Sequence, residues 1–212
     1  MKLYYSPGAC SLATRISLHE AGISAEFERV DLPARLTEIG ADYSTINCKG
    51  SVPLLILDDG QSMTETVALL DLIAERQPSL GVGGQLGRTR LIEMLSFLAT
   101  ELHVAFKPFF HGADPASKVL AAEAVARKLD LLNGRVREGY LFGCNFTVAD
   151  AYLFAMLRWA AAFDVRMQSE MFNYFERVAS RPAVRQSLLE EGLSGPQSLA
   201  TPPSPAIASH SR

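Results

Sequence analysis

The sequence predicts an α/β domain followed by an all-helical domain, and two patterns carry this prediction. Up to about residue 80, short strand-like runs alternate with helical repeats, whereas every long segment after it repeats at helical spacing. A chain of 212 residues, 48% of them apolar, is long enough to bury a core in each domain. We therefore expect domains at 1–78 and 87–193, a Pro/Gly linker at 79–86, and a tail at 194–212.

The first domain is expected to open with a β-α-β unit. Residues 2–5 read as a strand, residues 11–21 as a helix that Gly22 ends, and residues 26–31 as a second strand with alternating polarity. A Pro-Gly turn separates the first strand from the helix. This arrangement places the residues after the turn at a helix N-terminus.

The same domain is expected to close with a β-β-α unit. Residues 54–57 and 61–63 flank an Asp-Asp-Gly sequence, which is a hairpin turn signal. Thr64 then precedes an apolar repeat over 65–76, which predicts a helix.

The second domain is predicted to be helical throughout. Thr147-Val-Ala-Asp150 is a capping-box variant that starts a helix, so we assign Asp150 a folding role and not a catalytic one. The apolar stripes at helical spacing are Leu91, Leu95, Leu98, Leu102 and Ala105; Ala122, Val125, Leu129, Leu132 and Val136; and Val148, Ala151, Ala155 and Trp159. Residues 194–212 are rich in Ser, Pro and Ala without periodicity, and we expect them to be disordered.

Composition excludes several classes of function. The net charge is −3 and the basic residues are scattered, so the chain has no stripe to follow a nucleic acid backbone. Apolar stretches end well short of bilayer length, and the N-terminus enters a strand pattern without a signal-peptide layout, so we expect a cytoplasmic protein without a membrane contact. Three cysteines without metal-ligand spacing argue against a disulfide framework or a metal site.

Cys10 is the most informative single residue because it lies where the first strand meets the first helix. Unpaired N–H groups and the positive end of the helix dipole favour an anion there, and both lower the pKa of a thiol. The alternative is that Cys10 is a small buried hydrophobe, as free cysteines usually are.

Taken in order, these motifs resemble the cytosolic-type glutathione transferases. The shared features are Val52-Pro53 before the third strand, Thr64-Glu65-Thr66 at a helix start, the linker, and Phe-Thr-Val-Ala-Asp in the helical half. Three segments, Tyr4-Tyr-Ser-Pro-Gly-Ala-Cys-Ser-Leu, Glu101-Leu-His and Thr147-Val-Ala-Asp-Ala-Tyr-Leu-Phe, point to the bacterial beta class. The resemblance covers residues 1 to about 193 and implies a thioredoxin-like first domain.

The resemblance also implies a glutathione site. It makes the bond before Pro53 cis, so that the Val52 backbone pairs with the cysteinyl part of the tripeptide. It assigns Glu65 and Thr66 to the γ-glutamyl end, although helix capping is a rival role for Glu65. Arg35 is expected to meet the glycyl carboxylate, or else to be a solvated surface residue.

In the helical half, Ser96, His103 and Lys107 are seven and four residues apart, which on an α-helix makes a single polar stripe. The resemblance turns this stripe toward the cleft between the domains, with His103 beside the bound sulfur and Ser96 among the contacts. The chain departs from the family pattern at Ser96, where Asn is usual, and at Val104, where Lys is common; Cys48 and Thr14 each replace a common Pro.

The implied function is transfer of glutathione to small apolar electrophiles in a homodimer without a metal, with Cys10 and Ser11 as donors that favour the glutathione thiolate. Cys10 could also form a mixed disulfide with glutathione. Two alternatives remain open: a glutathione-dependent thiol-disulfide reductase or peroxidase, and a non-catalytic glutathione-binding ligandin or regulatory protein.

Overall fold

The computed structural model describes residues 1–137 and 139–193, so the predicted disorder of 194–212 lies outside the described residues. Its sheet has five strands in the order β3-β2-β1-β4-β5. They are β1 (Lys2–Tyr5), β2 (Glu26–Asp31), β3 (Leu36–Thr37), β4 (Leu54–Ile56) and β5 (Ser62–Thr64). β1 and β2 are parallel and the other pairs are antiparallel. The predicted mixed α/β domain is confirmed.

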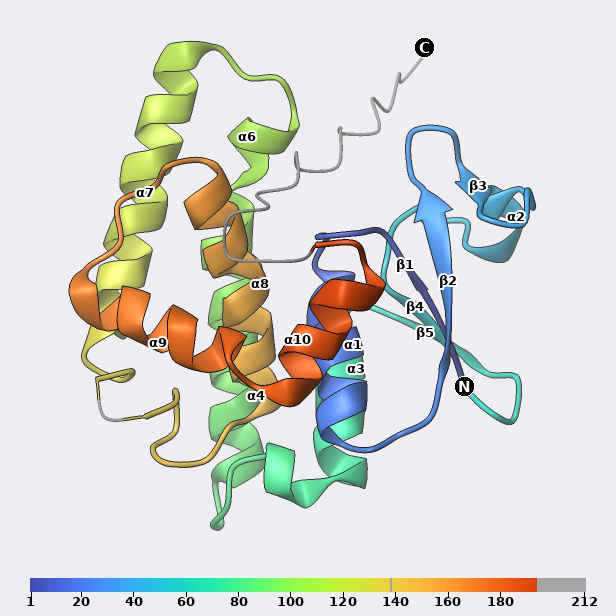
Figure 1. Ribbon diagram of the computed structural model, residues 1–212, viewed down its shortest axis with the longest axis horizontal. Coiled ribbons are helices and arrows are strands. Elements are labelled where there is room, and N and C mark those ends of the chain that lie inside the picture. The colour runs from blue at the N-terminus through green and yellow to red at the C-terminus, as the bar shows by residue number, and fades with distance from the viewer. Residues whose placement is uncertain (138, 194–212) are drawn as a thin grey trace.

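Two helices of this domain lie between the sheet and the helical half (Figure 1). They are α1 (Ser11–Glu20) and α3 (Thr66–Arg76), and both bury apolar side chains in the main core. A short helix α2 (Tyr43–Ile46) lies beyond β2 at the far end of the domain. The predicted start of α3 is corrected by one residue, because Glu65 has a positive φ of 73° and therefore precedes the helix. A 3₁₀ turn, η1 (Pro78–Leu80), leads into the helical half.

The second half is helical throughout, as predicted. Its elements are α4 (Gly87–Phe97), a π-helical segment η2 (Leu98–Leu102), α5 (His103–Ala105), α6 (Lys107–Phe110), α7 (Pro115–Asn133), α8 (Val148–Ala162), α9 (Ser169–Ala179) and α10 (Pro182–Glu190). Helix α8 runs through the middle, and its residues from Val148 to Ala160 are all buried. No helix in the described part of the chain is long and apolar enough to cross a membrane.

The π-helical segment η2 corrects one prediction about side-chain register. A π turn inserts about one residue, which rotates everything after it by about 100° relative to a continuous α-helix. Ser96 lies before η2 and His103 lies after it. The two therefore do not share one straight stripe, and the expected Ser96, His103 and Lys107 alignment is wrong.

The capping box of α8 is present as predicted and is more extensive than its sequence indicates. The Asp150 carboxylate accepts hydrogen bonds from the Thr147 N–H at 2.8 Å and hydroxyl at 2.7 Å, from the Leu141 N–H at 2.8 Å, and from the Tyr174 hydroxyl at 2.8 Å. Asp150 thus ties the preceding loop and α9 to the start of α8, which confirms its folding role.

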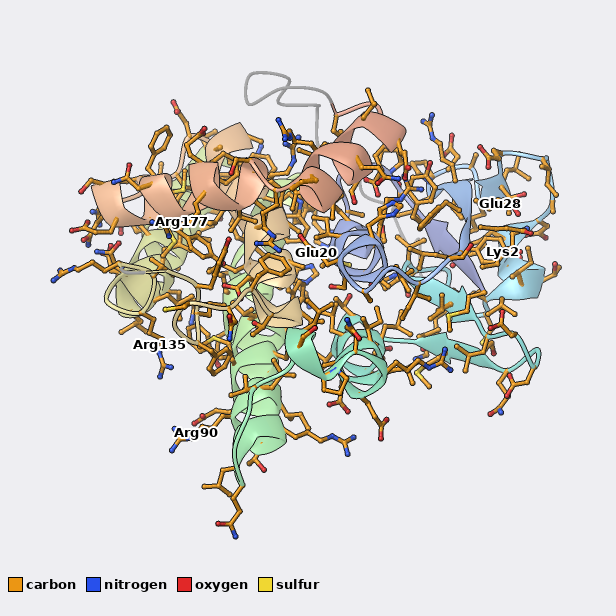
Figure 2. All side chains as sticks on the ribbon, turned by 60° about the horizontal axis from the view of Figure 1, so that its bottom comes forward. Lys2, Glu20, Glu28, Arg90, Arg135 and Arg177 are labelled. Atoms are coloured by element: carbon orange, nitrogen blue, oxygen red, sulfur yellow. The ribbon has the colours of Figure 1, made fainter. Side chains whose placement is uncertain are left out.

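Charged side chains tie elements together on both sides of the molecule. In Figure 2, Lys2 on β1 lies beside Glu28 on β2, and the two form an ion pair. Glu20 at the end of α1 receives two parallel hydrogen bonds from Arg181 at the start of α10, at 2.6 and 2.7 Å. A bidentate pair of this kind fixes orientation as well as distance. It holds α10 against α1, and so joins the two halves.

Candidate active site

Cys10 lies at the N-terminal end of α1, where the sequence predicts it. A turn over Ser6–Ala9 brings the chain from β1 into the helix, and Cys10 is the capping residue. Its side chain is partly buried, and its thiol donates to the Val52 carbonyl with a sulfur to oxygen distance of 3.5 Å. The Val52–Pro53 bond is cis, as the resemblance implies. The thiol and the Val52 main chain therefore meet at one edge of the first half.

The predicted low pKa of Cys10 is wrong. Burial raises the pKa of the thiol above its ordinary value, and this outweighs the Thr66 side chain and the backbone N–H groups of Cys10 and Ser11, which lower it. The helix terminus acts in the expected direction but is too weak to overcome desolvation. Cys10 in this structure is consequently a neutral thiol at physiological pH, and a hydrogen-bond donor.

Ser11 follows Cys10, but its hydroxyl faces the protein interior. The side chain is fully buried, and its Oγ donates to the Ser6 carbonyl at 3.3 Å and accepts from the Ser6 N–H at 3.3 Å. The prediction that Ser11 donates toward a ligand is therefore wrong for its hydroxyl. Its backbone N–H still points toward Cys10 and lowers the pKa of that thiol.

Thr66 and Tyr152 connect the thiol with the helical half. The Thr66 side chain lies close enough to Cys10 and to Tyr152 to lower the pKa of both groups. Burial raises the pKa of Tyr152 far above its ordinary value, so this hydroxyl keeps its proton. The first turn of α3 and the N-terminal part of α8 thus place hydroxyls close to Cys10.

His103 extends this cluster. Its Nδ1 lies 2.9 Å from the Tyr152 hydroxyl, and its ring centroid lies 4.8 Å from that of Trp159. Burial, and then the charge of Lys107, lower the pKa of His103 to about 4. The imidazole is therefore neutral at pH 7 and cannot act as a cation beside a thiolate. Lys107 is exposed but lies close enough to act electrostatically on the ring.

Glu65 has the backbone conformation of a strained residue. Its φ of 73° is uncommon for a residue with a side chain, and its carboxylate makes no capping hydrogen bond to α3. It pairs instead with Lys49, whose Nζ lies 2.7 Å from Glu65 Oε1 and 2.8 Å from Thr64 Oγ1. Strain of this kind persists mainly at functional positions. The capping alternative for Glu65 is therefore not supported.

Two predicted site residues are not joined to this cluster by any hydrogen bond or ion pair among the described residues. Arg35 is exposed in the turn before β3 and acts electrostatically on Asp42. Its own carbonyl accepts from the Tyr43 N–H at 2.8 Å. Ser96 is half-buried, and its carbonyl accepts from the Thr100 hydroxyl at 2.9 Å.

An aromatic face of the helical half lies next to His103. Phe110 packs edge-on against Trp159 with ring centroids 5.1 Å apart, and Phe109 stacks on Phe163 at 4.4 Å. Phe109, Phe110 and Phe163 are all half-buried, so their rings remain partly accessible. This face offers apolar, π-rich surface beside the polar cluster around Cys10.

Comparison with models of protein families identifies the family of this chain. Residues 8–76 match the family model of the glutathione S-transferase N-terminal domain, and residues 97–182 match the model of the C-terminal domain. The chain belongs to the glutathione S-transferase family. It is 40% identical over 200 residues to the glutathione S-transferase GstA of Escherichia coli O157:H7, with 91% of this chain and all of the relative covered.

Solved glutathione S-transferases share the fold closely. The bacterial beta class enzyme of Sphingomonas chungbukensis superimposes with a TM-score of 0.84 at 43% identity, over 91% of this chain and all of that one. A sphingomonad glutathione S-transferase solved as a complex with glutathione gives a TM-score of 0.84 at 42% identity, over 92% of this chain and all of that one. The resemblance to the beta class is confirmed.

Sequence reasoning missed three residues of the cluster in this glutathione S-transferase. Tyr152 and Trp159 lie on the same helix as the capping box, which was interpreted only as a folding signal. Lys49 lies in the irregular segment before β4 and reaches Glu65 across 16 residues of sequence. Local spacing predicts neither contact, because each depends on how distant elements pack.

Proposed function

We propose that this chain transfers glutathione to small apolar electrophiles, with aromatic electrophiles as the preferred class. The observation that carries the proposal is the convergence of the Val52 main chain, Glu65, Thr66 and Cys10 at one edge, next to the aromatic face of the helical half. Family membership and the relatives named glutathione S-transferases support it.

The chemistry of these residues suits the tripeptide. Glu65 offers a carboxylate to the α-amino group of the γ-glutamyl end, and Thr66 offers a hydroxyl and a helix N-terminal N–H to its carboxylate. The main chain of Val52 pairs with the cysteinyl backbone as an added strand does. Arg35 is assigned to the glycyl carboxylate, since its backbone is tied to Tyr43, whose hydroxyl bonds the Ser51 carbonyl beside Val52.

Thiolate stabilisation is assigned to hydrogen-bond donors and not to a base. Cys10 is a neutral thiol and can donate S–H to a thiolate, and the N–H groups at the start of α1 add to this. From the helical half, Tyr152 lies closest to this thiol in electrostatic terms, and the neutral His103 ring bonds to Tyr152. A stabilised thiolate beside the aromatic face then attacks the electrophile, and the leaving group departs as an anion.

The decisive experiment combines retention on immobilised glutathione with turnover of chlorodinitrobenzene. Retention with turnover is the expected result. Retention without turnover would contradict conjugation and support the ligandin alternative, which Ser96 and Val104 suggest. The raised pKa of Cys10 disfavours the reductase alternative, because thiol-disulfide exchange needs an attacking thiolate. Rapid stoichiometric glutathionylation of Cys10 by oxidised glutathione would reverse that preference.

We also propose that the protein is a cytoplasmic homodimer, as the resemblance implies. Analytical ultracentrifugation at micromolar concentration is expected to give a mass of twice the 23.1 kDa chain. A single monomer peak at that concentration would contradict the proposed dimer.

A further inference from the structure

The main chain of Gly8 is held from both sides by the helical half. Its N–H donates to Glu191 Oε2 at 2.9 Å, and its carbonyl accepts from Trp159 Nε1 at 2.7 Å. Gly8 has a positive φ of 71°, which a residue with a side chain rarely adopts. It lies two residues before Cys10, so these two bonds fix the turn that presents the thiol.

Glu191 is an unusual group to use for this purpose. It caps the C-terminal end of α10, where the helix dipole disfavours negative charge, and its side chain is fully buried. Gly8 itself is only half-buried, so its N–H does not require a buried acceptor. A buried carboxylate is costly, and the turn does not need it for hydrogen-bond satisfaction alone.

A buried counter-charge, which Glu191 shares with Glu190, lies next to Glu191. Arg15 on α1 lies with its Nε 3.6 Å from Glu191 Oε1 and is itself buried. The guanidinium is sandwiched between the rings of Tyr5 and Phe27, 4.0 and 4.1 Å from their centroids. Arg158 on α8 also acts on Glu191 electrostatically. Three elements, α1, α8 and α10, therefore converge on one carboxylate behind the Cys10 turn.

We propose that Glu191, paired with Arg15, is a positioning residue that holds the turn before Cys10 in the conformation needed for thiolate stabilisation. The geometry of this turn then depends on how α10 packs against the first half. The inference rests on the proposed glutathione transfer. Glu191 touches neither substrate nor thiol; it acts through Gly8. Because the start of α1 must hold its donors within a fraction of an ångström of the reacting sulfur, slackening Gly8 lowers turnover more than binding.

The charge of this group changes close to physiological pH. Burial raises the pKa of Glu191 to about 7, against the opposing effects of the Gly8 N–H, Arg15 and Arg158. The other ionisable groups facing it are Tyr5 from β1 and Glu190 from α10, and Glu190 is bonded to His19 of α1. Above about pH 7 the carboxylate accepts from Gly8 with full charge; below it the acceptor is neutral and weaker.

The test compares Glu191→Ala and Glu191→Gln with Glu190→Gln as the matched control. Glu190 is the next residue and lies 3.5 Å from Arg15, but it has no hydrogen bond to Gly8. Glu191→Ala is expected to lower kcat for chlorodinitrobenzene about tenfold with little change in KM for glutathione. Glu190→Gln is expected to retain wild-type values. Equal kcat in Glu191→Ala and wild type, with only a lower melting temperature, would overturn the proposal.

Glu191→Gln keeps an acceptor oxygen and removes the charge, which gives a readout that survives if the alanine variant does not fold. The ratio of wild-type to Glu191→Gln kcat is expected to exceed one at pH 8 and to fall toward one below pH 7, where both side chains are neutral. A ratio that does not change with pH would contradict the proposal.

Amide hydrogen exchange separates this inference from the proposed function. The Gly8 N–H is expected to exchange about tenfold faster in Glu191→Ala than in wild type or Glu190→Gln, whether or not the protein conjugates anything. If the wild-type protein does not conjugate but the Gly8 N–H still exchanges faster in Glu191→Ala, the positioning role of Glu191 stands and only the transferase proposal is overturned. If the wild-type protein conjugates but Glu191→Ala changes neither the exchange of the Gly8 N–H nor kcat, only the positioning role of Glu191 is overturned.

Discussion

Glu65 and Lys49 illustrate how much a single pair of residues contributes at the site. The Lys49 ammonium forms an ion pair with Glu65. The α-amino group of glutathione is proposed to bind the same carboxylate. Both side chains are largely exposed, so the pair itself adds little stability. We expect the ammonium of glutathione to compete with Lys49 for the Glu65 carboxylate.

Glu65→Gln is expected to weaken glutathione binding by about 1.5 to 3 kcal/mol, because a charge-assisted hydrogen bond is lost. Lys49→Met is the matched control and is expected to leave the affinity equal or higher, since it removes a competitor. Isothermal calorimetry measures both. If Lys49→Met weakens binding as much as Glu65→Gln, the two residues hold the ligand together and the competition does not exist.

At Cys10 the expected role is donation of S–H. Cys10→Ser keeps a donor and is expected to retain most of the conjugation activity, whereas Cys10→Ala is expected to lose about tenfold or more in kcat. Steady-state kinetics with chlorodinitrobenzene at pH 7 compares the two. Loss of activity in Cys10→Ser equal to that in Cys10→Ala would instead indicate that the sulfur itself reacts.

His103 makes stability depend on pH in a stated direction. Its pKa is about 4 in the folded protein and ordinarily about 6.5, so the unfolded chain binds the proton more readily. Stability is therefore full above pH 6.5 and falls as the pH drops toward 4, by about 2 to 3 kcal/mol from this group. Urea unfolding at pH 7 and pH 4.5 is expected to show a smaller loss in His103→Gln than in wild type or in His111→Gln, where the histidine is exposed. Equal losses in all three would contradict the burial effect.

Several residue roles followed from the sequence and others did not. The cis bond at Pro53 was implied by resemblance, and the structure has it. The pKa of Cys10 was predicted in the wrong direction because the helix terminus is visible in a sequence but the packing around the thiol is not. The role predicted for the Ser11 hydroxyl was wrong for the same reason, since the orientation of this hydroxyl depends on its bond to the Ser6 carbonyl.

At the scale of elements, local chemistry predicts starts and stops better than register. Four consecutive residues encode the capping box of α8, which is present as predicted. The π-helical segment η2 has no such signal, since it differs from an α-helix by one inserted residue. The strand β3 and the helix α2 are two and four residues long, too short for a periodic pattern to reveal them.

Asp150 offers a test at this scale. Asp150→Ala is expected to lower the free energy of unfolding by about 3 to 5 kcal/mol, because it leaves buried donors from the loop before α8 and from α9 without an acceptor. Asp114→Ala is the matched control: Asp114 caps α7 at the surface and should cost about 1 kcal/mol. Denaturant unfolding compares the two. Similar losses would mean that the buried network adds nothing beyond an ordinary cap.

At the scale of the molecule, the two halves share one core. The main apolar cluster includes Leu12 and Ile16 of α1 together with Leu153 and Leu157 of α8, and α1 packs against both α8 and α10. The predicted bounds at 1–78, 79–86 and 87–193 remain predictions about chain segments. Apolar burial that crosses such a boundary makes independent folding of either segment unfavourable.

This shared core predicts how the chain responds to shortening. A protein ending at residue 193 is expected to keep the melting temperature and glutathione affinity of the full chain, because the Ser-, Pro- and Ala-rich composition of 194–212 offers little to bury.

A protein ending at residue 180 loses α10, and with it the Arg181 pair to Glu20, the Glu191 bond to Gly8 and the buried Leu193. It is expected to melt about 6 to 12 °C lower, because roughly 3 kcal/mol is lost from a chain of this size. Differential scanning calorimetry should then show one transition for residues 1–193, since α1 cannot remain folded once the helices that cover it have left. Two separate transitions in that protein would show that the halves fold independently.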